Sequence, residues 1–343
     1  MIENRQERSM LITASLVIIA IVHISIALIY AKSVLIPFTL AIFVALLVSP
    51  VMDFLIKKYK TPSAIAFALT ILLVIMFLFL LYTFFSYAIQ TIVQTADNYS
   101  TSFIALMEKT FEYLNRWHIE MDSQKLIIAT KTQIPKIITN SFGTVVGFLS
   151  STIFVCIFVL FLLIGYNPQN QPKGIYADII HKTRKYIATK IIVSIITGLL
   201  VWMTLSAFGL QLAAVFGMIA FLLNFIPSIG SIIATLVPVP IAFAQFQNPW
   251  MIALVIIIPG AIQITIGNII EPKIMGKELS LHPAAILLAL SFWGLFWGII
   301  GMFLAVPITA IIRIILMQFE SLKPIGNLLA GKLPPIESVR ETT

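Results

Sequence analysis

The sequence predicts an all-α polytopic integral membrane protein with about six to eight transmembrane helices. Of its 343 residues, 59% are hydrophobic and only 10% are charged, whereas a soluble domain carries roughly 25% charged residues. The mean hydropathy is +1.03, and long stretches contain no charged side chain. A chain this apolar needs lipid as its solvent, so chain length does not predict the number of domains as it would for a soluble protein.

Residues 1–90 are expected to form a first domain of three membrane spans. Apolar runs of about 20 residues, the length that crosses a bilayer, extend over 10–31, 34–52 and about 63–88. The first run is longer than the apolar part of a signal peptide, and no small-residue cleavage site follows it. We therefore interpret it as a span.

Residues 91–140 have a different pattern, in which ten charged side chains alternate with apolar ones. Apolar side chains recur there at helical spacing, as at Phe103, Met107 and Phe111. Pro135 is expected to end or kink a helix. The pattern predicts an extracytoplasmic amphipathic insert of two or three helices, outside the hydrocarbon.

The third domain, residues 141–320, is expected to be a second membrane region, followed by a polar cytoplasmic tail over 321–343. Its first span covers about 143–165, and residues 166–186 are expected to be a polar loop that contains Lys173, His181, Lys182, Arg184 and Lys185. Residues 191–270 then contain no Asp, Glu, Lys or Arg, and neither do residues 279–312.

Two segments of this region are predicted to be broken or re-entrant helical hairpins. The first, about 212–245, is interrupted by Pro227 and Gly230, which remove a backbone donor and loosen the chain. The second, about 281–312, turns at Gly294, Gly298 and Gly301 and ends near Pro307. A membrane tolerates such breaks only where protein or a water-filled cavity satisfies the backbone. Ordinary kinked spans remain the alternative.

The distribution of lysine and arginine predicts the orientation. With the N-terminus in the cytoplasm, the basic clusters at 57–60 and 173–185 and the C-terminal tail also lie inside, and the 91–140 insert lies outside. The formal net charge of +8 is therefore interpreted as contact with anionic lipid, and no nucleic-acid partner is expected.

Glu271 is the first candidate for a functional residue. It ends the uncharged stretch and precedes Pro272, and a carboxylate at membrane depth is costly unless it is paired, hydrated or protonated. Such a group can carry a proton during transport. The alternative is a helix-end anchor that is paired with Lys273.

Amide side chains beside the breaks complete the candidate site, because each offers an acceptor and a donor. The predicted substrate- or ion-binding set is Asn224, Pro227, Gly230, Gln263, Asn268 and Glu271, in which Pro227 and Gly230 shape the backbone. The predicted hinge set is Pro272, Gly276, Gly294, Gly298 and Pro307. For the amides, repair of broken backbone or helix–helix hydrogen bonding remains the alternative.

Several other classes of site have no support in the sequence. The phosphate-binding pattern G-x-x-x-x-G-K-[ST] does not occur, so ATP is not expected as the energy source. The four histidines do not cluster at metal-ligand spacing, and the one cysteine, Cys156, cannot form an internal disulfide. No enzyme activity, metal or cofactor is expected.

The residues at the breaks resemble the AI-2E family, the autoinducer-2 exporter family. The motifs are Asn224-Phe225-Ile226-Pro227-Ser228-Ile229-Gly230, Asn268 with Glu271-Pro272-Lys273-Ile274-Met275-Gly276, and the runs Leu281-His282-Pro283, Phe292-Trp293-Gly294 and Ala305-Val306-Pro307. The resemblance implies about eight membrane helices, a bacterial-type plasma membrane and oligomers. It also implies either export of autoinducer-2 or sodium or lithium/proton antiport.

The sequence thus predicts a secondary transporter that exports a small polar organic molecule such as autoinducer-2 and is coupled to an ion gradient. Substrate is expected where residues 224–230 meet residues 263–276. The alternatives are a Na⁺ or Li⁺/H⁺ antiporter, a passive oligomeric channel and a membrane scaffold. The expected partners are membrane lipid, a small-molecule or ion substrate, including transported H⁺ or Na⁺, and further copies of the chain.

Overall fold

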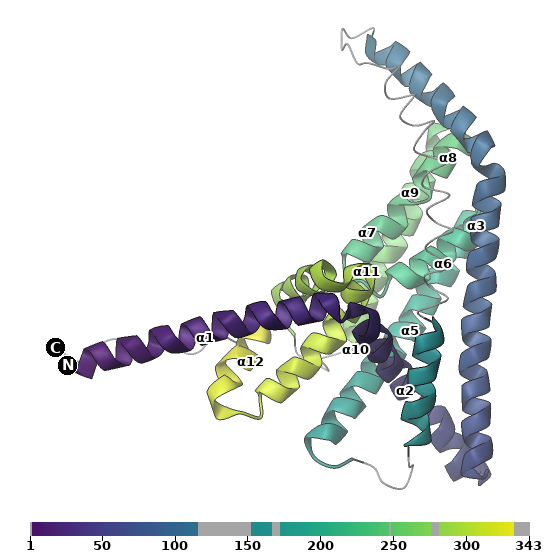
Figure 1. The fold of residues 1–343 in the computed structure, drawn as a ribbon. Helices are drawn as coiled ribbons and strands as arrows, with labels where there is room; N and C mark the ends of the chain where they lie inside the picture. The colour runs from purple at the N-terminus through teal and green to yellow at the C-terminus, as the bar shows by residue number, and fades with distance from the viewer. Residues whose placement is uncertain (1, 116–151, 167–171, 247, 276–280, 333–343) are drawn as a thin grey trace. The chain divides into compact units, whose positions relative to one another are not determined.

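The computed structural model describes residues 2–115, 152–166, 172–246, 248–275 and 281–332, which are nearly all helical (Figure 1). No strand occurs within these ranges. Six helices in them are long and apolar enough to cross a membrane. The predicted class, an all-α polytopic membrane protein, is therefore confirmed.

The chain divides into two compact units. One comprises Met1–Leu46, Phe154–Ile180 and Leu279–Thr343, and the other comprises Leu47–Ile153 and His181–Glu278. The second unit contains the break at Asn224 and the candidate residue Glu271.

Three long helices form the N-terminal region: α1 (Ile2–Tyr30), α2 (Lys32–Tyr59) and α3 (Ser63–Asn115). Helix α3 has no proline or glycine, so nothing in its sequence ends the helix where the predicted third span gives way to the insert. The described part of the insert is therefore the continuation of α3. The rest of the insert, residues 116–140, lies outside the described residues.

A short apolar helix, Thr152–Ile164, occupies the described part of the predicted fourth span. The next helix, α5 (Ile175–Ala207), begins well inside the segment expected to be a polar loop. That expectation was wrong for residues 175–186. Their basic side chains lie on a helix that contains neither proline nor glycine before Gly198, so polarity alone did not mark a loop.

The segment predicted as the first hairpin consists of α6 (Ala213–Leu223), α7 (Ile229–Leu236) and α8 (Val239–Gln245). Helices α6 and α7 contact each other on either side of the break. The side chain of Gln245 accepts a hydrogen bond from Gln211 N (2.8 Å) and donates one to Gly209 O (2.7 Å). Because these bonds join the two ends of the segment, it is a hairpin and not a single kinked helix.

Close backbone approach makes glycine necessary at the turn of this hairpin. A Cβ atom added to Gly230 would lie 1.8 Å from the carbonyl oxygen of Leu223. Ser228, the N-cap residue of α7, has φ 61°, a conformation that non-glycine residues seldom adopt.

Helix α9 (Pro249–Thr265) follows, and Asn248 caps it by accepting a hydrogen bond from Trp250 N at 3.0 Å. It continues through a π-helical turn, η1 (Ile266–Ile270), into the short helix α10 (Glu271–Met275).

The second predicted hairpin lies within α11 (Pro283–Leu316) in the other unit. Gly298 has φ 62° and ψ −141°, so the helix is interrupted there. A Cβ added to Gly301 would lie 2.0 Å from the carbonyl oxygen of Trp293, which shows that the chain folds back. Pro307 is buried in the second arm, and the chain continues through η2 (Glu320–Leu322) to α12 (Lys323–Leu329).

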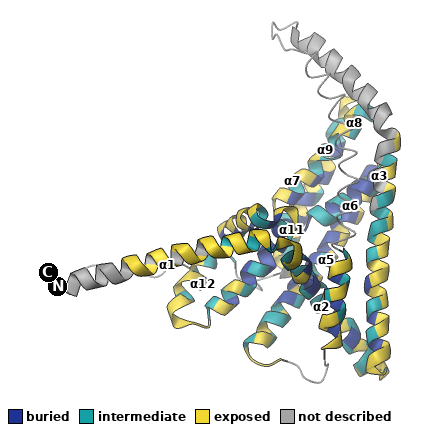
Figure 2. Cartoon of the chain, viewed as in Figure 1, coloured by how far each residue is buried: buried dark blue, intermediate teal, exposed yellow. Residues whose placement is uncertain are grey.

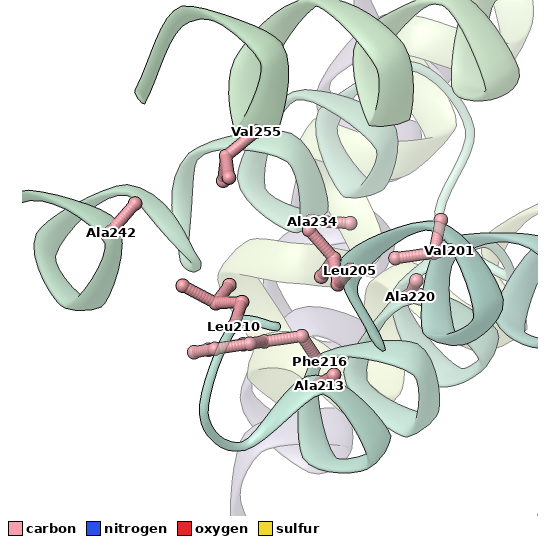
Figure 3. Close-up of a cluster of buried hydrophobic side chains, with 9 residues drawn as sticks. All are labelled: Val201, Leu205, Leu210, Ala213, Phe216, Ala220, Ala234, Ala242 and Val255. Carbon is pink, nitrogen blue, oxygen red and sulfur yellow. The ribbon is translucent and has the colours of Figure 1, made fainter. Parts of the chain in front are cut away.

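Apolar side chains are exposed along much of the surface, most clearly on α1 (Figure 2). This exposure fits a lipid-facing surface. In the second unit, one buried cluster draws side chains from α5, α6, α7, α8 and α9 (Figure 3). Its members are Val201, Leu205, Leu210, Ala213, Phe216, Ala220, Ala234, Ala242 and Val255. Four of the nine are alanines, and such small side chains let helices approach closely.

The two close approaches yield a prediction about stability. Gly230→Ala and Gly301→Ala each place a Cβ against a backbone carbonyl, so each should lower the free energy of unfolding by about 2–3 kcal/mol. Thermal unfolding of the purified protein in detergent measures the change. The control is Gly165→Ala, whose Cβ would meet no atom nearer than 3.9 Å and should change stability by less than about 0.5 kcal/mol. Equal effects at all three positions would contradict the prediction.

Candidate functional site

A stripe of polar side chains follows the buried face of α5. Tyr186, Lys190, Ser194 and Thr197 are all buried, and their spacing of three or four residues places them on one side of the helix. Thr197 donates its hydroxyl to Val193 O at 2.8 Å. The polar groups of Lys190 and Ser194 instead bind side chains from other parts of the same unit.

Lys190 forms an ion pair with Glu271. The Lys190 side chain is 2% exposed and that of Glu271 is 15% exposed, so both charges lie in a poorly solvated environment. Water cannot compensate either charge if the other is lost, which makes removal of a single partner strongly destabilising. The pair connects α5 to the start of α10.

The π turn η1 determines which way Glu271 faces. A π turn holds one residue more than an α turn, and the Glu271 N–H bonds to Ile266 O, five residues back. The extra residue shifts Glu271 onto the face of α9 that carries Gln263 and Ile266, both of which are buried. Asn268, within the same turn, is exposed.

Asn224 connects the hairpin break to the same stripe. It is 3% exposed, and its Nδ2 donates to Ser194 Oγ at 3.0 Å. Since Ser194 lies one turn beyond Lys190, the break and Glu271 approach consecutive turns of α5. The result is a buried array of two charges, an amide and a hydroxyl.

Gln263 is 3% exposed, and neither Nε2 nor Oε1 has a hydrogen-bond partner among the described residues. Buried polar atoms are nearly always satisfied in proteins. Gln263 therefore differs from Asn224, which has a partner.

The other predicted site residues are distributed as follows. Pro227 lies in the break, and Gly230 lies in the first turn of α7, where the close approach of Leu223 O requires glycine. Asn268 and Pro272 are exposed, so they are not part of the buried array. Gly276 lies outside the described residues, and Gly294, Gly298 and Pro307 belong to α11 in the other unit.

Three buried residues of the site were not predicted from the sequence: Lys190, Tyr186 and Ser194. A signal was present, because Lys190 is the last charge before the uncharged stretch 191–270 and Glu271 is the first after it. The two charges that bracket this stretch pair with each other. Lys273, the partner considered from the sequence, is exposed.

No group of three or more His, Cys, Asp or Glu side chains within the described ranges could hold a metal ion. The polar groups of this site are thus the Lys190–Glu271 ion pair together with neutral amide and hydroxyl groups. Such a site can bind and release a proton or a polar solute.

Comparison with known proteins shows which family and which relatives the chain is similar to. Residues 16–321 match the family described as AI-2E family transporter. The chain is 29% identical to the AI-2 transport protein TqsA of Escherichia coli K12, over 88% of this chain and 90% of that protein. It is 30% identical to a putative transport protein of Borreliella burgdorferi, over 88% and 86% of the two chains. A putative transport protein of Haemophilus influenzae is 29% identical over 83% and 87%.

The ion pair yields a second prediction. Glu271→Gln leaves the buried Lys190 ammonium unpaired and should destabilise the protein by about 3–5 kcal/mol. Lys190→Met should destabilise it less, because the carboxylate left behind is partly exposed to solvent, whereas the ammonium is almost fully buried. The double variant Lys190→Met/Glu271→Gln should recover most of the loss, because no buried charge remains. Unfolding of the four proteins under one set of conditions provides a double-mutant cycle.

The matched control is Glu320→Gln, which breaks an exposed ion pair with Lys323. Exposed pairs contribute about 0–1 kcal/mol, so this variant should unfold like the wild type. If the effects of the Lys190 and Glu271 substitutions simply add, the two residues are not coupled.

Proposed function

Because the chain belongs to the AI-2E family of transporters, we propose that it is a secondary transporter that exports a small polar organic molecule similar to autoinducer-2. Export draws on an ion gradient, with the proton as the coupling ion. The name of the Escherichia coli relative supports this substrate class. The protein is multi-pass, and we propose that it lies in the plasma membrane as a homo-oligomer with both termini in the cytoplasm.

The single observation that carries the proposal is the buried Lys190–Glu271 ion pair. Proton binding to Glu271 removes its negative charge and with it the attraction to Lys190. The protein then holds an uncompensated ammonium, which favours any rearrangement that hydrates it or brings it a new partner. Protonation of one carboxylate thereby biases a conformational equilibrium, as coupling between proton and solute requires.

The hairpin break provides the connection between proton and solute. Ser194 lies one turn from Lys190 on α5, and together with its partner Asn224 it offers a hydroxyl and an amide to a polar ligand. A ligand that competes for these groups releases the break from α5. Proton and ligand thus act on neighbouring turns of the same helix.

Cation/proton antiport is the second candidate, and the same carboxylate supports it. Glu271 would exchange H⁺ for Na⁺ or Li⁺ without an organic substrate. Lys190 opposes this mechanism, since its ammonium already compensates the carboxylate and repels a second cation. Organic solute export therefore remains the preferred proposal.

The test uses purified protein in liposomes that enclose a pH dye. Addition of autoinducer-2 should change the lumenal pH, and Glu271→Gln should reduce this response at least about tenfold because the variant carries no exchangeable proton there. Glu320→Gln, at the exposed pair, should respond like the wild type.

Other outcomes decide between the alternatives. A pH change on addition of Na⁺ or Li⁺ alone, lost in Glu271→Gln, would replace solute export with antiport. Solute flux without any pH change, and equal in Glu271→Gln, would indicate a channel or uncoupled carrier and contradict proton coupling. If neither autoinducer-2 nor the cations change the lumenal pH, although each protein is folded and inserted, the proposal is contradicted.

A further inference from the structure

Gln263 lies on the part of α9 that faces α7. Gly260 and Gly267, three residues before it and four after it, share its side of the helix. A Cβ added to Gly260 would lie 3.4 Å from Thr235 Cγ2, and one added to Gly267 would lie 3.8 Å from Ser231 Oγ. Both neighbours belong to α7, and these two helices are in contact. Gln263 is thus set between two glycines where α9 meets α7.

We propose that the Gln263 amide is a ligand-binding group that recognises an uncharged, hydroxyl-bearing solute at the contact between α7 and α9. The inference rests on the proposed function and deepens it, since it names the group that recognises the solute. The ion pair at Glu271 serves coupling, whereas Gln263 serves recognition.

The energetics of burial favour this assignment. An amide with no partner loses its hydration without compensation, so it is destabilising compared with an apolar side chain of the same size. The chain shows the satisfied alternative at Gln245, which has the same side chain and forms hydrogen bonds from both its amide atoms. Gln263 has no such bonds within the described part of the chain, so the fold gains nothing from its amide.

The two unpartnered atoms of Gln263, Oε1 and Nε2, also indicate the class of ligand. Oε1 needs a donor and Nε2 needs an acceptor. A bare cation would satisfy only Oε1, and an anion only Nε2. A hydroxyl group both donates and accepts, so a neutral alcohol or diol satisfies both atoms.

The two glycines let α9 approach α7 closely beside the amide. At Gly267 even an added Cβ would make only an ordinary van der Waals contact with Ser231 Oγ, so a methyl group fits there without displacing anything. Ser231 contributes a hydroxyl at the same place. A solute that reaches Gln263 would therefore also meet the Ser231 hydroxyl, on the glycine side of η1.

The first experiment asks whether the amide serves the fold. Gln263→Leu removes two unsatisfied polar atoms and should raise the apparent melting temperature by about 2–4 °C in detergent. Gln245→Leu, the same substitution at a satisfied amide, should lower it. A lower melting temperature for Gln263→Leu would show that the amide is held by a structural partner, such as a buried water, and would overturn the inference.

The second experiment measures ligand binding as thermal stabilisation. Autoinducer-2 and erythritol should each raise the melting temperature of the wild type, and the hydroxyl-free pentane-2,3-dione should not. Gln263→Leu should raise the ligand concentration needed for half-saturation at least about tenfold, as expected for loss of two hydrogen bonds. Gly267→Ala should weaken binding while leaving the melting temperature of the free protein unchanged or higher, because alanine favours a helix.

These results separate the inference from the proposed function. A hydroxyl-dependent shift that survives Gln263→Leu would overturn the role of Gln263 and leave proton-coupled export standing. Loss of the shift in Gln263→Leu, with no lumenal pH response in liposomes, would support recognition and contradict coupling. If the hydroxylated solutes produce no shift in the wild type, or salt alone reproduces it, the inference is wrong.

Discussion

The hydrocarbon core of a bilayer offers no hydrogen bonds and no solvation for charge, and this constraint determines how the second unit is built. The chain breaks at Asn224–Ser228 and places Lys190 within an apolar helix. Neither feature would persist alone in lipid. Each finds a partner within the protein, since Glu271 compensates Lys190 and Asn224, at the break, donates to Ser194 Oγ. The energetic need for internal partners thus brings together segments that are far apart in the sequence.

Helix α5 is the element on which these partners converge. Lys190 and Ser194, one turn apart, bind the start of α10 and the hairpin break. The close contact of α5 with α6 has a steric basis as well, because a Cβ on Gly198 would lie 2.7 Å from Gly217 O. Any movement of the hairpin or of Glu271 therefore changes the environment of the same short stretch of α5. This arrangement gives proton binding and solute binding a common structural target.

The sequence predicted most of the fold but only part of the site. The spans, the break at Pro227 and Gly230 and the turn at Gly298 all follow from composition and local backbone chemistry, so single-sequence reasoning could find them. The partner of Glu271 could not be found in this way, because Lys190 is 81 residues away and only the folded chain brings the two together. The π turn could not be predicted either, because no sequence pattern identifies such a turn. It nevertheless determines that Glu271 faces the site and Asn268 does not. The early start of α5 was missed because basic side chains at a membrane interface resemble a loop in composition.

A transporter must release what it binds, and this limits how far its polar groups can satisfy one another. Asn224 is bonded to a serine and Glu271 to a lysine, so a ligand or proton that acts on them must displace an existing partner. Such exchanges have small net free energies and are suited to switching between conformations. Gln263 has nothing to displace among the described residues, so a ligand there gains both hydrogen bonds in full. Groups that already have partners can therefore provide coupling, and the unpartnered amide can provide affinity. The two functions are for this reason assigned to different residues.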